Sequence, residues 1–419
     1  MKPTAIKIAL LTVICFPFLL TPGHKTESDH RKEDKPIFQI DDIDKRLITA
    51  NNRFAFGLYE ATVKEEEDKN ILLSPFSVSL ALAMTYNGAD LETKEAMVRT
   101  LEVQNLSMEE INQSHAALKN VIEHADPDIQ LNIANSLWGR EGITFHEEFL
   151  KKNEAFYDAY LTTMDFNDPK AAATINGWVH DHTNGKIEKM VNDDIHPRTI
   201  LFLLNAIYFK GEWAEPFDEA YTTERDFYLA DGSTQKVPMM SQSGEWKYFQ
   251  GEGFEAVQLP YGNGRISMNI FLPDENSDLT QFQQQLNEQD WQSWMDHFQS
   301  TPGNIRLPRF QVEYDKTLNE ALKALGMEVA FDEGRANFER MVASPNENVV
   351  IKEVKHRSFI EVNEEGTEAA AATSVEAQLV SAPVPTNTFN MEVNRPFFFT
   401  IQDNETEALL FMGSVVEMG

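Results

Sequence analysis

The segment Ile200–Lys210 (ILFLLNAIYFK) is apolar at almost every position, and no soluble fold can leave such a run uncovered. Side chains of a strand alternate between its two faces, so a strand with this sequence must be covered on both sides. We therefore predict a central strand of a large sheet. The chain has 419 residues, of which 42% are hydrophobic, and short turns separate its periodic segments. One large domain is expected, rather than two of ordinary size.

The first residues predict an export signal. Lys2 and Lys7 precede the apolar run Ile8–Leu20, which is too short and too interrupted by proline to span a membrane comfortably. We expect a secretory signal peptide over residues 1–23, a disordered polar linker over 24–36 and a folded domain over 37–419. The alternative is a buried helix or a membrane anchor. The predicted location is secreted, either extracellular or periplasmic and at the cell surface, with no membrane span in the mature chain.

The only cysteine, Cys15, lies inside this signal. A mature exported chain would then have no disulfide, no thiol nucleophile and no cysteine-ligated zinc. The formal net charge is −31, and loss of Lys2 and Lys7 makes it −31 − 2 = −33. Such an acidic chain is a poor partner for nucleic acid, which needs a basic surface.

Hydrophobic periodicity predicts an α+β fold with large, mainly antiparallel sheets. The expected helices are Ile43–Lys64, Ser77–Tyr86, Phe149–Tyr160, Thr174–Thr183 and Leu318–Leu325. The expected strands, besides Ile200–Lys210, are Ile129–Trp138, Ser267–Leu272, Ile305–Leu307, Phe310–Tyr314, Phe359–Val362, Arg395–Ile401 and Leu409–Val416.

Motifs that carry catalysis are missing from the sequence. There is no G-x-G-x-x-G or phosphate-loop pattern and no G-x-S-x-G elbow, and no S-x-x-K pairing stands out. His180, Asp181 and His182 have the wrong spacing for two metal ligands on one helix face. We therefore expect no catalytic residues, no metal and no cofactor.

The segment Glu364–Ala382 (EEGTEAAAATSVEAQLVSA) has small residues between two predicted strands. Drawn as a strand, it places both of its later glutamates on one face and only small, uncharged residues on the other: Thr367, Ala369, Ala371, Thr373, Val375 and Ala377. Such a strand can enter a formed sheet with its uncharged face buried. A surface helix built on alanine and glutamate is the alternative.

Seven segments of the chain together resemble the serpin family in order and spacing, over about Ile37 to Gly419. They are Asn70–Met97, Asn205–Phe217, Val237–Met240, Leu307–Phe310, Leu325–Phe331, Glu364–Ala372 and the pair Arg395–Phe397 with Phe411–Val415. Leu91 departs from the resemblance, because many family members have glycine there.

The resemblance implies the serpin fold, with three β-sheets, eight to nine helices and an exposed reactive loop at about residues 364–390. It also implies a monomeric, metastable inhibitor of serine proteases and not an enzyme. In such inhibitors the protease cuts the loop and is held as a covalent acyl-enzyme while the loop inserts into the large sheet. A non-inhibitory member, cleaved as a substrate or acting as a carrier, is the alternative.

The resemblance also assigns roles to residues by position. The hinge of the loop corresponds to Gly366, Thr367, Glu368, Ala369, Ala370, Ala371 and Ala372. The polar cluster beneath the parting strands corresponds to Ser74, Ser77, Asn205 and His356, and the start of insertion to Trp213 and Glu364.

The family's usual count places the scissile bond at Val380–Ser381, with Leu379 and Ala382 left open. No Lys, Arg or Asp occurs between Arg357 and Arg395, which removes the anchor of trypsin-like and caspase-like proteases. The predicted target is an elastase-like or subtilisin-like enzyme.

Overall fold

The computed structural model describes residues 38–66, 68–197, 199–343, 349–367 and 388–418. All of these residues belong to one compact unit, Phe38–Gly419. Within the described part, no helix is long and apolar enough to cross a membrane.

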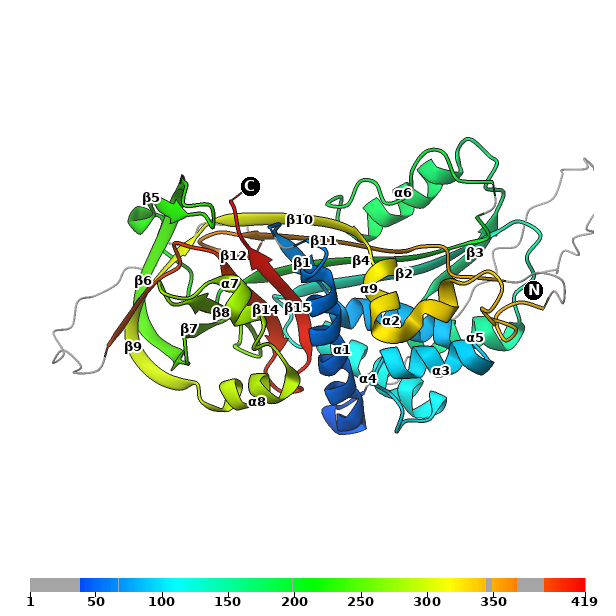
Figure 1. Cartoon of the computed structure of the whole chain (residues 1–419), viewed down its shortest axis with the longest axis horizontal. Coiled ribbons are helices and arrows are strands. Elements are labelled where there is room, and N and C mark those ends of the chain that lie inside the picture. The colour runs from blue at the N-terminus through cyan, green and yellow to red at the C-terminus, as the bar shows by residue number, and fades with distance from the viewer. Residues whose placement is uncertain (1–37, 67, 198, 344–348, 368–387, 419) are drawn as a thin grey trace, which may run out of the picture. The chain divides into compact units, whose positions relative to one another are not determined.

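A six-stranded sheet contains the predicted central strand. Its order is β10 (Phe310–Thr317), β11 (Val354–Val362), β12 (Gly366–Thr367), β4 (Leu201–Glu212), β2 (Gln130–Arg140) and β3 (Tyr160–Met164). Nearly every residue of β4 is buried, as the apolar run predicted. The sheet is covered on both faces, and Figure 1 shows α6 (Ala171–His182) and α2 (Pro75–Tyr86) on its opposite sides.

The two faces of this sheet bury different apolar clusters. The inner face packs against α2, whose residues are all buried, and belongs to the main core. The outer face and α6 form a second cluster that includes Trp138, Ile175, Phe202 and Leu204. Alternation along β4 divides the strand between them, because Phe202 and Leu204 point outward while Asn205 and Ile207 point inward.

A second hydrogen-bonded network contains nine strands. Their order is β1 (Ile71–Leu73), β15 (Leu409–Val415), β14 (Phe397–Asp403), β8 (Ile266–Pro273), β7 (Phe254–Pro260), β6 (Thr234–Gln250), β9 (Gln299–Pro308) and β13 (Phe389–Glu392), with β5 (Thr223–Tyr228) also paired to β6. The long strand β6 pairs with β5 over its first part and with β7 over its last part. Two groups of strands are joined through it.

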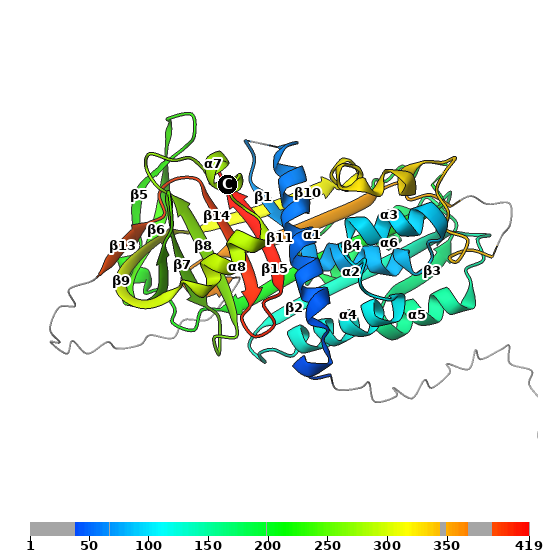
Figure 2. The ribbon, with the colours of Figure 1, turned by 60° about the horizontal axis from the view of Figure 1, so that its bottom comes forward.

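The remaining helices in the described part are α1 (Lys45–Val63), α3 (Leu91–Thr100), α4 (Met108–Glu123), α5 (Glu147–Tyr157), α7 (Leu279–Gln283), α8 (Glu288–Asp296) and α9 (Asn319–Leu322). Short helical turns cover Ile40–Asp42, Glu219–Tyr221, Lys323–Met327 and Glu328–Phe331. Figure 2 shows α1 passing between β15 and α2, both of which it contacts.

The ends of two predicted helices are set by residues with positive φ. The helix predicted over Phe149–Tyr160 stops at Tyr157, earlier than expected, because Asp158 adopts a left-handed backbone with φ of 51° and Tyr160 begins β3. The helix predicted over Leu318–Leu325 is interrupted at Gly326, which is non-helical with φ of 100°. A separate helical turn follows at Glu328–Phe331.

Candidate functional site

The short strand β12 lies between β4 and β11 at one end of the six-stranded sheet. Gly366 pairs with Glu212, while Thr367 pairs with Gly211 on one side and with Val362 on the other. Thr367 is fully buried, and its Oγ1 lies 2.7 Å from the hydroxyl of Tyr261. The first two residues of the predicted hinge that the structure describes are therefore already seated in the sheet.

Gly366 has a backbone that requires glycine. Its φ is 148°, and a Cβ atom would lie 2.2 Å from the carbonyl oxygen of Gly211 and 2.6 Å from Cα of Glu212. Because both obstacles are backbone atoms, no side chain can be accommodated without moving β4. The chain turns into the sheet at this position only because the residue is glycine.

Trp213 and Glu364, the residues assigned to the start of insertion, lie beside the turn that leads into β12. The backbone N–H of Trp213 donates to the carbonyl of Glu365 (2.8 Å), and its indole Nε1–H donates to the carbonyl of Asn363 (2.9 Å). The Trp213 ring also stacks on Tyr261, with ring centroids 4.4 Å apart. These contacts hold the turn that leads into β12 against the end of β4.

The Glu364 carboxylate is buried and receives two kinds of donor. The guanidinium of Arg309 donates to it from Nε (2.8 Å) and Nη2 (2.6 Å), and the hydroxyl of Thr222 donates as well. Burial raises the pKa of Glu364, but the hydrogen bonds from Arg309 and Thr222 outweigh it and leave the pKa below its usual value. Glu364 is therefore a carboxylate that anchors the start of the loop.

The four residues of the predicted polar cluster come together beneath β4 and β11. Asn205 donates from Nδ2 to the carbonyl of Ser77 (2.9 Å), and its Oδ1 lies 3.0 Å from Nδ1 of His356. The backbone N–H of Ser74 donates to Nε2 of His356 (3.2 Å), and the Ser74 hydroxyl donates to the carbonyl of Leu410 (2.7 Å). Because Ser74 N–H can only donate, Nδ1 of His356 carries the proton and donates to Asn205.

His356 is neutral in this environment. Burial lowers its pKa to about 4, against a smaller opposite effect of the Leu72 backbone. A proton on Nε2 would also face the N–H of Ser74, so two donors would point at each other. The cluster thus ties β11 to β4 and to the N-terminus of α2 only while His356 is uncharged.

Three further residues of this site were not predicted as functional: Tyr261, Arg309 and Thr222. Arg309 lies inside the quoted segment Leu307–Phe310, so the resemblance contained a signal for it. Tyr261 is 106 residues from Thr367 in sequence, and no local pattern joins them. The remaining predicted residues lie outside the described part: Glu368, Ala369, Ala370, Ala371, Ala372, Leu379, Val380, Ser381 and Ala382.

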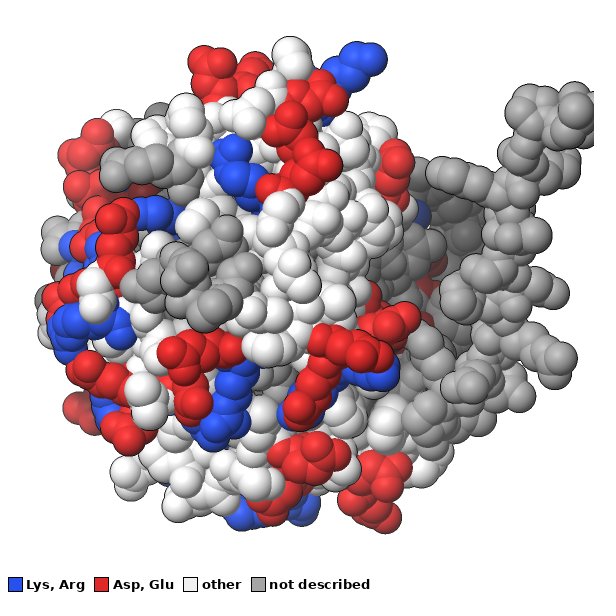
Figure 3. All heavy atoms as spheres, turned by 90° about the vertical axis from the view of Figure 1, so that its right-hand side faces the viewer, with Lys and Arg blue, Asp and Glu red and all other residues white. Residues whose placement is uncertain are grey.

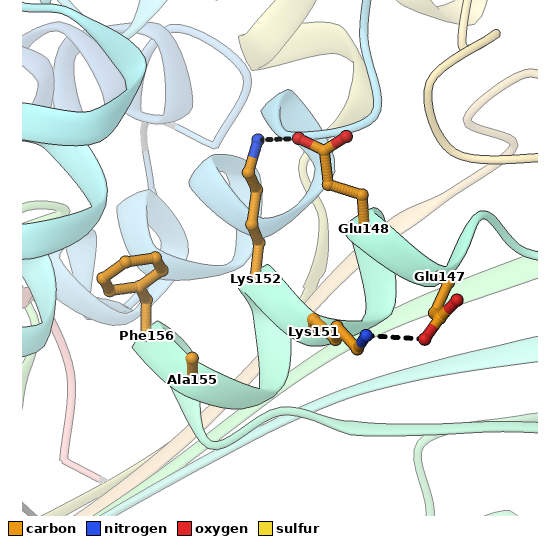
Figure 4. A pocket seen from close by; sticks show the side chains of 6 residues that line it. All are labelled: Glu147, Glu148, Lys151, Lys152, Ala155 and Phe156. Carbon is orange, nitrogen blue, oxygen red and sulfur yellow. Dashed lines mark ion pairs between the residues drawn. The ribbon is translucent and has the colours of Figure 1, made fainter.

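A shallow hollow on α5 offers no comparable chemistry. Figure 4 shows that it is lined by Glu147, Glu148, Lys151, Lys152, Ala155 and Phe156. Its charged side chains form the (i, i+4) ion pairs Glu147–Lys151 and Glu148–Lys152, as is common on solvated helices. Figure 3 likewise shows acidic side chains lying beside basic ones on the face that it draws.

The known proteins that this chain resembles are serpins. A family model described as Serpin (serine protease inhibitor) matches residues 49–418. This chain belongs to the serpin family. Antithrombin-III of Mus musculus is 33% identical over 404 residues, which cover 94% of this chain and 86% of that protein.

Solved serpin structures have the same fold. The thermophilic serpin tengpin in its native state matches with a TM-score of 0.83 and 33% identity, covering 90% of this chain and 95% of that one. Human thyroxine-binding globulin matches with a TM-score of 0.81 and 27% identity, covering 89% and 99%. The predicted α+β serpin fold is confirmed, and the family is one of serine protease inhibitors.

Proposed function

We propose that this serpin is an exported suicide inhibitor of elastase-like or subtilisin-like serine endopeptidases. The target would attack the reactive loop at Val380–Ser381 and remain attached as an acyl-enzyme while the loop inserts between β4 and β11. The observation that carries the proposal is the position of Thr367, which is buried between these strands at the beginning of the loop.

The hinge sequence supports insertion beyond Thr367. Thr367 faces the inner side of the sheet, so alternate residues after it would face inward in the same register: Ala369, Ala371, Thr373, Val375 and Ala377. All are small and uncharged. Glu368 and Glu376 would face the outer side. Roughly fifteen inserted residues at about 3.3 Å each would carry an attached protease about 50 Å.

The predicted specificity follows from what the loop lacks. No Lys, Arg or Asp occurs between Arg357 and Arg395, so the loop sequence lacks the basic anchor of trypsin-like proteases and the aspartate anchor of caspase-like proteases. Small aliphatic residues around Val380 suit shallow apolar pockets, in which each methylene decides about 1–3 kcal/mol. Leu379 and Ala382 are the alternative contact points.

A second candidate is a non-inhibitory serpin that binds a small molecule or serves as a substrate. Thyroxine-binding globulin, solved with thyroxine, shows that close structural similarity extends to a carrier. The small, uncharged inner face of the hinge in this chain favours the inhibitory function. Export after residues 1–23, a monomeric state and independence from cofactors are part of the proposal.

The test uses a chain beginning at His24, mixed with pancreatic elastase and with a subtilisin-type protease. We expect a complex that survives denaturing electrophoresis and a released C-terminal peptide that begins at Ser381. Complete cleavage by both proteases without a complex would support the non-inhibitory alternative. If the released peptide begins at another residue, the scissile bond lies elsewhere in the loop, but the proposed mechanism is unaffected.

A further inference from the structure

The sequence contains three copies of the pattern Asn-x-Ser/Thr, at which oligosaccharides are attached to asparagine in secreted chains. They begin at Asn105, Asn112 and Asn404, and none has proline at the middle position. The pattern alone gives the three asparagines equal standing. An attached sugar replaces one hydrogen of the asparagine Nδ2, so the folded protein can carry it only where that hydrogen is not already used and where space lies beside it.

Asn112 is closed to a sugar by the packing of three helices. It lies in α4 and is fully buried. Its Nδ2 donates to Oδ1 of Asn87, the residue after α2 (2.9 Å), and its Oδ1 accepts from Nδ2 of Asn87 (3.1 Å) and from the hydroxyl of Tyr157 in α5 (2.6 Å). A sugar on Nδ2 would separate α4 from α2 and leave buried polar groups unpaired. A chain modified at Asn112 could not reach this fold.

Asn404 lies on the surface, in the turn between β14 and β15, but its amide is fully used. Its Nδ2 donates to the carbonyl of Gly264 (2.9 Å) and to the hydroxyl of Ser267 in β8 (2.7 Å). Thr406, the third residue of this pattern, donates its hydroxyl to the buried carboxylate of Asp403 (2.6 Å). A sugar on Asn404 would remove one of the two amide bonds and would have to lie against β8.

Asn105 has an amide that the fold does not use. The residue is exposed in the connection between α3 and α4, and its side chain forms no hydrogen bond within the described part of the chain. Its backbone is nevertheless fixed, because its carbonyl accepts from Nη1 of Arg46 (2.7 Å). Ser107, the third residue of the pattern, is exposed and accepts at Oγ from the N–H of Glu110 (3.2 Å), so its hydroxyl hydrogen stays available.

Open space also lies beside Asn105. Its neighbour Gln104 lines a hollow on α3 together with Leu91 and Val98, and Leu91 is 66% exposed. Figure 2 shows α3 and α4 on the opposite side of α1 from β13, the strand that follows the reactive loop. An oligosaccharide at Asn105 would therefore have room next to α3 and would lie away from the C-terminal end of the loop.

We propose that Asn105 is the site of N-linked glycosylation in this chain, and that the folded protein carries no sugar at Asn112 or Asn404. The donor is an oligosaccharide held on a lipid phosphate or pyrophosphate. A bond forms between Nδ2 of Asn105 and C1 of the first sugar, while the bond from C1 to the phosphate oxygen breaks. The phosphate leaves with the electron pair, and Nδ2 gives one proton to a base of the transferase. This inference goes beyond the proposed inhibition and does not depend on it.

The experiment locates the sugar on the folded protein. The full chain, with a host secretion signal placed ahead of it, is expressed in a host that glycosylates asparagine, and the folded secreted protein is isolated. An amidase that releases such sugars converts each modified asparagine to aspartate, so mass spectrometry of the peptides identifies the site. We expect conversion at position 105 and at neither 112 nor 404. A folded protein without any sugar, or with a sugar at Asn112 or Asn404, would overturn the proposal.

Three variants separate the acceptor from the helix that follows it. Asn105→Gln removes an exposed side chain without hydrogen bonds, and the folded protein should lose its sugar. Ser107→Asn removes the hydroxyl that the pattern requires but keeps a residue that caps α4, so it should also fold without sugar. Ser107→Thr is the matched control, because it keeps both pattern and cap and should be modified like the parent. A sugar at Asn105 in Ser107→Asn, or none in Ser107→Thr, would overturn the assignment.

Discussion

The hydroxyl oxygens of Tyr261 and Thr367 lie 2.7 Å apart in a buried pocket beneath the ring of Trp213. Tyr261 begins the turn after β7, and Thr367 is the last described residue before the loop. The bond therefore joins the hinge to the end of β7, a strand of the nine-stranded network rather than of the six-stranded sheet. Loss of either hydroxyl leaves the other without its partner in a dry environment, which costs more than the bond itself contributes.

Tyr261→Phe is expected to loosen the seated hinge. The hydroxyl of Thr367 would remain buried without a partner, and Thr367→Val removes that penalty. A double-mutant cycle on urea unfolding should give a coupling of about 1 kcal/mol between the two residues. Faster hydrogen exchange at the Gly366 and Thr367 amides in Tyr261→Phe is the local measurement. Unchanged exchange would mean that backbone pairing alone seats the hinge.

Thr367→Arg is expected to turn the inhibitor into a substrate. Thr367 is fully buried against the Tyr261 hydroxyl, so a guanidinium at this position would lose its hydration. At least about tenfold more chain should be cleaved per protease trapped. Thr367→Ser keeps the small size and the hydroxyl, and should trap like the parent. Normal trapping by the arginine variant would contradict loop insertion.

Acidification is expected to weaken the fold between about pH 6.5 and pH 4. The pKa of His356 falls from 6.5 to about 4 on folding, because burial disfavours the charged ring. Above pH 6.5 His356 is neutral in both the folded and the unfolded chain, so its titration does not reduce the free energy of unfolding. Below it only the unfolded chain gains the proton, and on the order of 3 kcal/mol is lost by pH 4. Burial lowers the pKa of His115 as well, to about 3.

Urea midpoints from pH 7 to pH 4 measure this dependence. His356→Gln should be less stable at pH 7, where it loses the native cluster, and should show a shallower decline toward pH 4. His124→Gln removes an exposed histidine and serves as the control. An equal slope in the parent and His356→Gln would assign the acid sensitivity to other groups.

Leu91→Gly is expected to stabilise the native state by about 0.5–1 kcal/mol. Leu91 has φ of 46°, in the left-handed region that strains a residue with a Cβ atom, and the residue is 66% exposed. Burial of its side chain therefore contributes little to offset the backbone strain. Leu91→Ala keeps a Cβ atom and should give no comparable gain in urea midpoint. A loss of stability in Leu91→Gly would mean that the side chain contributes more than its strain costs.

Val380→Arg should create an inhibitor of trypsin, which needs the basic anchor that the loop lacks. Leu379→Arg and Ala382→Arg place the same residue at the alternative positions. Only the variant with arginine at the scissile residue should form a complex that survives denaturing electrophoresis, while the others are cut without trapping. If Leu379→Arg or Ala382→Arg traps trypsin instead, the scissile bond lies at that position. If no variant traps trypsin, the result counts against the inhibitory mechanism.

Strong local patterns were enough to predict much of the fold. The apolar run Ile200–Lys210 became β4, and Ser74-Pro75 became the N-cap and first residue of α2. Helix ends were harder, since the left-handed conformation of Asp158 has no marker such as glycine.

The site depended on the resemblance, because its contacts join distant parts of the chain. Ser74 and His356 are 282 residues apart, and Arg309 and Glu364 are 55 apart. Spacing and periodicity describe one element at a time, so they cannot pair such residues. The hydrogen bond from Arg357 of β11 to the carbonyl of Lys189 depends on how the chain after α6 crosses the six-stranded sheet. No residue type in the sequence predicts this contact.

The polar cluster of Ser74, Ser77, Asn205 and His356 also decides what happens when β4 and β11 part by chance. The side chains at this point include hydroxyl, amide and imidazole groups, which water can solvate. An aliphatic lining in the same place would expose apolar surface, and strands of neighbouring molecules would associate with it. If the proposed insertion takes place, a lining of groups that water solvates readily would keep the open sheet from starting aggregation.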